Sequence, residues 1–68
     1  MAAPRYEFRI RGRLSDTLLA RFDPLESEVE RVHTVLRGRM RDQAELHGVI
    51  ERMQAVGLEL IEIRRLPD

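Results

Sequence analysis

The two histidines are the first residues to consider for chemistry, because imidazole serves both as a metal ligand and as a general base. His33 and His47 are well separated in a chain that has no cysteine. A metal site would need both histidines to converge with a carboxylate such as Glu28, Glu45 or Glu51. An i,i+4 contact with Glu51 on a helix is the simpler explanation of His47. We therefore expect no metal and no cofactor.

Three other patterns could belong to a catalytic or phosphate-binding site, and each has a simpler structural explanation. A Ser–His–Asp arrangement would have to use Ser15 or Ser27, and Ser15 is better explained as a helix cap. The carboxylates at 26, 28 and 30 have no cleft implied around them. The 4 glycines are scattered, so they form no phosphate-cradling loop. The sequence predicts a protein that is not an enzyme.

The charged residues balance overall but are expected to be unevenly placed. All 12 basic residues are arginine, as a GC-rich genome favours, and 12 acidic residues bring the net charge to zero. The predicted strand segments hold nine arginines against three acids, a net +6, and the rest of the chain is correspondingly acidic. These nine arginines are Arg5, Arg9, Arg11, Arg13, Arg37, Arg39, Arg41, Arg64 and Arg65. If helices cover one sheet face, the open face is predicted to be positive.

The first half of the chain predicts a strand and a short helix. Apolar and charged residues alternate from Arg5 to Leu14, which is typical of a strand with one buried face. Gly12 interrupts this run, as at a bulge or a strand end. A short helix capped by Ser15 or Asp16 is expected through about residue 22, where Asp-Pro stops it.

The middle of the chain is ambiguous. Residues 25–31 alternate acids with other residues and could form an acidic loop or the start of an edge strand. A loop is the favoured interpretation, passing into a strand over about 31–40 that carries β-branched residues. Gly38 is expected to mark a bulge in that strand.

The region from Asp42 to Leu66 predicts a capped helix followed by a strand. Asp42 with Glu45 three residues later forms a capping box, and apolar residues then follow helical spacing. Gly57 supplies the left-handed position that ends a helix expected over 43–56. A last strand is predicted over 58–65.

These elements predict one α+β domain over residues 1–68, with 1–4 as a frayed tail and 67–68 as a second tail. The order β-α-β-α-β indicates a small mixed three-stranded sheet with both helices on one face. The strands ending near Met40 and starting near Leu58 are expected to run parallel, joined by the long helix. This element order is close to a ferredoxin-like or ACT-like sandwich that lacks one strand.

Two segments carry a resemblance to other proteins. YEFRIRGRLSD (6–16) and TVLRGRMRDQAELHGVIERMQAVGLELIEIRRL (34–66) resemble a set of small actinobacterial proteins with no assigned function. The shared pattern is an aromatic first strand, D-Q-A-x-L-H-G at a helix start, and G-L-x-L-x-x-x-R-R-L. The resemblance implies a cytoplasmic bacterial protein and no particular activity.

The functional hypothesis is a self-associating protein-interaction or regulatory module that uses an arginine-rich open sheet face. A chain of 68 residues has a small core, which favours a homo-oligomer. A protein partner is also expected, in the cytoplasm and without membrane insertion. The alternative is a binding module for an anionic ligand or nucleic acid, the latter less favoured because the aromatic residues are needed in the core. The candidate interface or anion-binding residues are Arg9, Arg11, Val35, Arg37, Arg39, Leu60 and Arg64.

Overall fold

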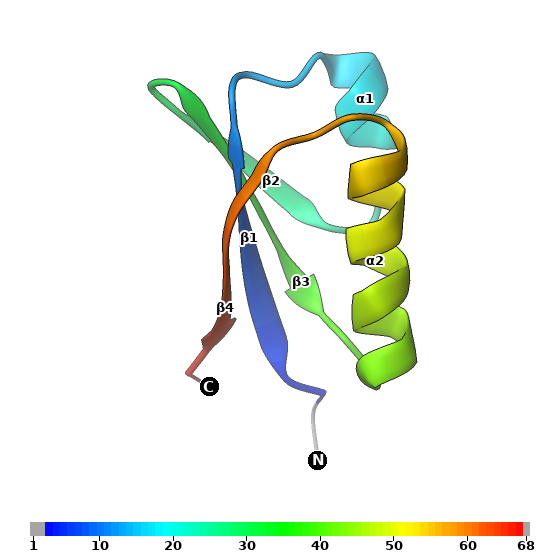
Figure 1. Cartoon of the computed structure of the whole chain (residues 1–68). Coiled ribbons are helices and arrows are strands. Elements are labelled where there is room, and N and C mark those ends of the chain that lie inside the picture. The colour runs from blue at the N-terminus through cyan, green and yellow to red at the C-terminus, as the bar shows by residue number, and fades with distance from the viewer. Residues whose placement is uncertain (1–2, 68) are drawn as a thin grey trace.

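The fold is built around its first strand, which lies in the interior of a four-stranded sheet. The computed structural model describes residues 3–67. The elements are β1 (Arg5–Arg11), α1 (Asp16–Ala20), β2 (Glu26–Glu30), β3 (His33–Arg39), α2 (Gln43–Ala55) and β4 (Leu60–Leu66). The strand order is β2-β3-β1-β4, and each neighbouring pair is antiparallel. Both helices lie on one side of the sheet, as predicted (Figure 1).

The prediction of a mixed three-stranded sheet was wrong, because the acidic segment forms β2. Residues 26–30 pair antiparallel with β3 through a hairpin whose loop is Arg31 and Val32. Arg31 has a φ of 45°, the left-handed conformation that a two-residue hairpin loop requires. With this fourth strand the chain has the complete β-α-β-β-α-β order of the ferredoxin-like fold. β3 and β4 do run in the same direction, but β1 lies between them.

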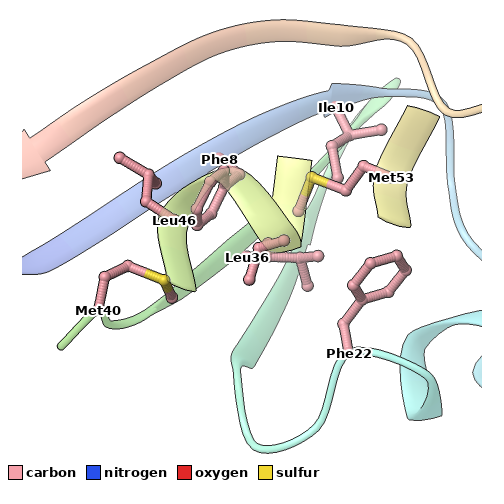
Figure 2. Packing of buried hydrophobic residues seen from close by; sticks show 8 residues of the cluster. Phe8, Ile10, Phe22, Leu36, Met40, Leu46 and Met53 are labelled. Atoms are coloured by element: carbon pink, nitrogen blue, oxygen red, sulfur yellow. The ribbon is translucent and has the colours of Figure 1, made fainter. Parts of the chain in front are cut away.

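The core lies between the sheet and the helices. Phe8 and Ile10 of β1 are fully buried, and they share their face with Leu36 of β3. The helical side is closed by the stripe that the sequence predicted on α2 and by Phe22, which follows α1 (Figure 2). Each fully buried large side chain contributes about 1.5–3 kcal/mol of transfer free energy. These few residues therefore supply most of the favourable burial in so short a chain.

The predicted cap of α2 is present with one difference. The Asp42 side chain accepts a hydrogen bond from the Glu45 amide at 2.8 Å. The Glu45 carboxylate returns to the amide of Arg41 at 2.7 Å, one residue earlier than the standard box. At the other end Gly57 has a φ of 80° and ends the helix, as expected.

Thr34 connects the end of β1 to the sheet. Its buried hydroxyl donates to the Gly12 carbonyl at 2.8 Å and accepts from the Leu14 amide at 3.2 Å. Gly12 has a φ of 91°, so β1 ends at Arg11 and not at Leu14 as predicted. A buried hydroxyl in this place satisfies two backbone groups that would otherwise lack partners.

The chain ends were predicted as tails. Residues 1–2 and 68 lie outside the described residues. Within the described part, the Pro4 carbonyl accepts a hydrogen bond from the Met40 amide at 3.0 Å, which ties the start of β1 to the end of β3. Among residues 3–67, neither helix has the length and apolar character needed to cross a bilayer.

Gly38 and Gly48 form a matched pair that tests the packing. Gly38 pairs regularly with Tyr6, so it marks no bulge as had been predicted. A Cβ at Gly38 would lie 2.1 Å from Cδ2 of Leu25, whereas a Cβ at Gly48 in α2 would meet nothing within 4 Å. We expect Gly38→Ala to lower the free energy of unfolding by roughly 1–3 kcal/mol through overpacking. Gly48→Ala should raise it by about 1 kcal/mol through helix propensity.

Urea denaturation monitored by circular dichroism measures both changes. The double variant Leu25→Ala/Gly38→Ala provides the control, because removing the clashing side chain should make the effect of Gly38→Ala clearly smaller. Equal effects of Gly38→Ala with and without Leu25 would contradict the close approach.

A charged candidate binding surface on the open sheet face

The open sheet face is the side of the sheet turned away from both helices. The strand registers assign to it Arg5, Glu7, Arg9, Arg11, Glu26, Glu28, Glu30, His33, Val35, Arg37, Arg39, Glu62, Arg64 and Leu66. All but three of these carry a formal charge at neutral pH. Val35 and Leu60 were predicted as aliphatic residues of an interface on this face. The large exposed aliphatic residues lie instead at the sheet edges and at the hairpin: Val29, Val32, Ile61 and Ile63.

Glu7 lies at the centre of the open sheet face and is only 3% exposed. Arg37 of β3 donates through Nε to Glu7 Oε2 at 2.9 Å. Arg64 of β4 donates to Oε1 at 3.1 Å from the other side, and Arg9 Nη2 lies 3.8 Å from the same oxygen. One carboxylate therefore joins guanidinium groups from the three strands β3, β1 and β4.

The arginines continue outward to the acidic edge strand. Arg37 also donates to Glu28 at 3.0 Å, and Arg9 donates to Glu30 at 2.9 Å. These contacts connect β2 to the centre of the face, so the network crosses all four strands. In residues 3–67 no buried side-chain polar atom is left without a hydrogen-bond partner. The buried charge of Glu7 needs such partners, because an unpaired charged group is costly where water is excluded.

The electrostatic environment favours the charged forms of this network. The hydrogen bond from Arg37 and the positive charge of Arg64 hold the pKa of Glu7 below its ordinary value, against the opposing effect of burial. The hydrogen bond to Glu7 raises the pKa of Arg37, and that to Glu30 raises the pKa of Arg9. The face therefore keeps all these charges at neutral pH.

The structure brings three of the seven predicted site residues together. Arg9, Arg37 and Arg64 surround Glu7. Arg11 lies further along the same face and pairs with Glu59. Arg39 lies at the opposite end of its strand, where its guanidinium donates to the Ala3 carbonyl.

The two predicted aliphatic site residues do not lie together. Val35 is on the open sheet face but is 0% exposed, flanked in the register by Arg9 and Glu28. Leu60 pairs with Ile10 and packs against the core on the opposite face. A register shift between β1 and β4 next to Ile10 reverses the alternation that would have placed Leu60 on the open side. An interface centre made of both residues is therefore not formed.

The predicted strong positive charge of the open sheet face is mostly compensated. The three acids of β2, which were assigned to a loop, lie on this face. The face then carries six arginines against five glutamates, a net charge of +1 with His33 neutral. Sequence reasoning also missed the role of Glu7. The sequence feature that could have indicated this role is an acid in the middle of a strand, with an arginine two residues away on either side.

One shallow hollow opens at the end of the face near Arg39. Its lining includes three arginines, Arg5, Arg37 and Arg39, and one acid, Glu26, around a volume of about 390 Å³. Guanidinium groups gathered around a polar hollow suit a small anion. The lining of this hollow carries a net charge of +2, from three arginines and one glutamate.

The histidines do not converge. His33 lies at the start of β3 on the open sheet face, and His47 is exposed on α2, on the other side of the sheet. In the described chain, no group of three or more histidine, cysteine or acidic residues is placed to hold a metal ion.

The fold and this face define a small α+β domain of ferredoxin-like topology whose open sheet is covered by a charged network. The chain belongs to the family described as a domain of unknown function, DUF8691, which matches residues 5–64. The match spans all of β1 to β3 and both helices, and most of β4. No curated protein and no solved structure matches the sequence.

Substitution of Glu7 tests whether the network holds the sheet together. Glu7→Gln keeps the shape but leaves three guanidinium groups without their shared anion, so we expect a loss of roughly 1–3 kcal/mol at pH 7. Because folding lowers the pKa of Glu7 from its ordinary value of 4.5, its contribution is complete above that pH. It is lost as the pH falls through the lower folded-state pKa.

Denaturation of both proteins from neutral to acidic pH measures this difference, which should shrink only in the acidic range. Glu28→Gln is the matched control, because that carboxylate also pairs with Arg37 but its side chain is 53% exposed. Its loss should stay below about 1 kcal/mol. Equal losses for the two variants would show that burial of Glu7 adds nothing.

Proposed function

We propose that the chain is a small non-enzymatic protein-interaction or regulatory module that self-associates and binds a partner protein through its open sheet face. The observation that carries this proposal is the ordered network of Arg9, Arg37 and Arg64 around Glu7. The cytoplasm remains the predicted location, and the actinobacterial resemblance remains a prediction.

Preorganisation supports a role in recognition. Ordering a long side chain on binding costs about 0.5–1.5 kcal/mol, and the network removes part of that cost in advance. Arginine is also enriched in protein interfaces, where its planar group both stacks and donates hydrogen bonds. The side chain of Arg64 remains 58% exposed while it donates to Glu7, so it can still contact a partner.

The charge pattern indicates the kind of partner. Arginines lie along β1, β3 and β4, while the edge strand β2 presents only acids on this face. A complementary protein surface would carry acidic groups opposite Arg11 and Arg64 and basic groups opposite β2. Such alternating charges give specificity and orientation more than raw affinity.

A comparative pull-down tests the use of this face. Wild-type protein, Arg11→Ala/Arg64→Ala and the helix-side control Arg21→Ala are immobilised, and bound proteins from a bacterial lysate are quantified by mass spectrometry. We expect a protein retained by wild type and by the control but reduced at least about tenfold by the open-face variant. The interaction must then be reproduced with that protein purified. Retention that is equal for all three baits would contradict the proposal.

The hollow lined by Arg5, Arg37 and Arg39 favours one second candidate, a site for a small anionic ligand. Titration with pyrophosphate and with a short single-stranded oligonucleotide, followed by nuclear magnetic resonance, tests it. Binding should shift the resonances of these arginines, weaken as salt increases, and be lost in Arg5→Ala. No shift at low salt would eliminate this candidate without affecting the protein-binding proposal.

A further inference from the structure

The two edges of the sheet differ in length, charge and exposure. β4 is one edge, with 7 residues, and β2 is the other, with 5. Within residues 3–67 β4 pairs only with β1, so alternate backbone N–H and C=O groups along its outer side have no strand partner there. Its exposed residues run from 61 to 65 and include Ile61 and Ile63, which are 43% and 38% exposed. An exposed edge with aliphatic residues is a template for strand addition.

The sequence of β4 is complementary to itself in one antiparallel register. When two copies pair about a two-fold axis perpendicular to the sheet, the residues opposite each other must share a face. An axis through Ile63 places Ile63 opposite itself and places each Glu62 opposite an Arg64. The pairing thus has two cross-strand ion pairs around an apolar contact, and each kind of pair stabilises a sheet.

The neighbouring registers are unfavourable. An axis through Glu62 would place two carboxylates opposite each other, and an axis through Arg64 would oppose two guanidinium groups. Like charges in directly opposite positions destabilise a sheet. The register shift between β1 and β4 lies at the Ile61 end, so the three central pairs use the regular part of the strand.

The other edge strand, β2, is acidic and is therefore unfavourable for pairing with a second copy of itself. In a self-pairing of β2 about Glu28, Glu28 would face itself and Glu26 would face Glu30. Every charged pair is then repulsive, so this edge does not add a second copy. Two chains joined through β4 expose only β2 at both ends, and the assembly closes as a dimer instead of growing into a filament.

We infer that two copies of this chain pair antiparallel through their β4 edges, with Ile63 on the two-fold axis, to form a continuous eight-stranded sheet. The occupant of the β4 edge is a second copy, because Glu62 and Arg64 of one copy are complementary to Arg64 and Glu62 of the other around the shared Ile63 contact. The inference rests on the self-association part of the proposed function. It adds that the two open sheet faces remain uncovered and become one continuous surface.

Single cysteines test the register, since the chain has no cysteine of its own. Cβ atoms directly opposite in an antiparallel pair lie about 4.5–5.5 Å apart, close to the range of a disulfide. Ile63→Cys should therefore form a disulfide-linked dimer under mild oxidation at least about tenfold faster than Val29→Cys. Val29 is the matched control, being 42% exposed on the other edge strand. Equal rates, or a faster mixed disulfide when the two variants are combined, would overturn the β4 pairing.

A complementary charge exchange tests the ion pairs. Glu62→Arg and Arg64→Glu should each weaken self-association at least about tenfold, because both cross-strand pairs become like-charged. Mixing the two variants should restore a heterodimer, in which the two arginines of the first variant face the two glutamates of the second. Circular dichroism confirms that each variant is folded before mixing. Failure of the mixture to associate while wild type does would overturn the register.

Sedimentation equilibrium from about 10 µM to about 1 mM gives the oligomeric state, since a single strand edge is a small interface and is expected to associate weakly. A monomer throughout would refute both the inference and the self-association part of the proposed function. A dimer without the Ile63→Cys disulfide would refute only the inference. The pull-down repeated with Arg11→Ala alone, which leaves Glu62, Ile63 and Arg64 of the β4 edge unchanged, decides separately whether the open sheet face binds a partner.

Discussion

The buried carboxylate of Glu7 is the constraint on which the exposed side of this sheet depends. An anion with so little access to water must be matched by donors, and Arg37 and Arg64 supply them from the strands on either side of β1. The same glutamate would be destabilising if either neighbouring strand were displaced. Glu7 therefore favours one alignment of β3 and β4 on β1, while the apolar residues of the other face enforce the same alignment from the core.

This arrangement also determines what the open sheet face can recognise. Guanidinium groups that already share carboxylates would neutralise few phosphates of a polyanion and so displace few of its counterions, which is the reason that the proposed function favours a protein partner. Arg5, Arg37 and Arg39 line the shallow hollow at one end of the face, together with Glu26. Elsewhere the alternation of acids and bases suits a protein surface of mixed charge. The prediction of a broadly positive face depended on treating β2 as a loop.

Local sequence patterns were sufficient to predict the elements that are determined by residues close together in the chain. The alternation in β1, the cap at Asp42 and the stop at Gly57 were all predicted from the sequence, and so were both helices on one face. β2 was not, because its five residues include a single aliphatic and its acids pair with Arg9 and Arg37 of other strands. Strand propensity does not detect such a segment, because glutamate is depleted in strands and its partners here lie in other strands.

The register shift near Ile10 also limited what could be predicted from the sequence about the open sheet face. One extra residue in β4 moves Leu60 into the core and leaves Glu62 and Arg64 on the open side, so a strict period of two assigns the faces incorrectly. The two edges would also differ in how their charges act in the inferred dimer. An edge with one sign of charge repels its own copy, whereas an edge whose signs alternate about an isoleucine attracts it. The difference between β2 and β4 therefore favours a closed dimer over an open polymer.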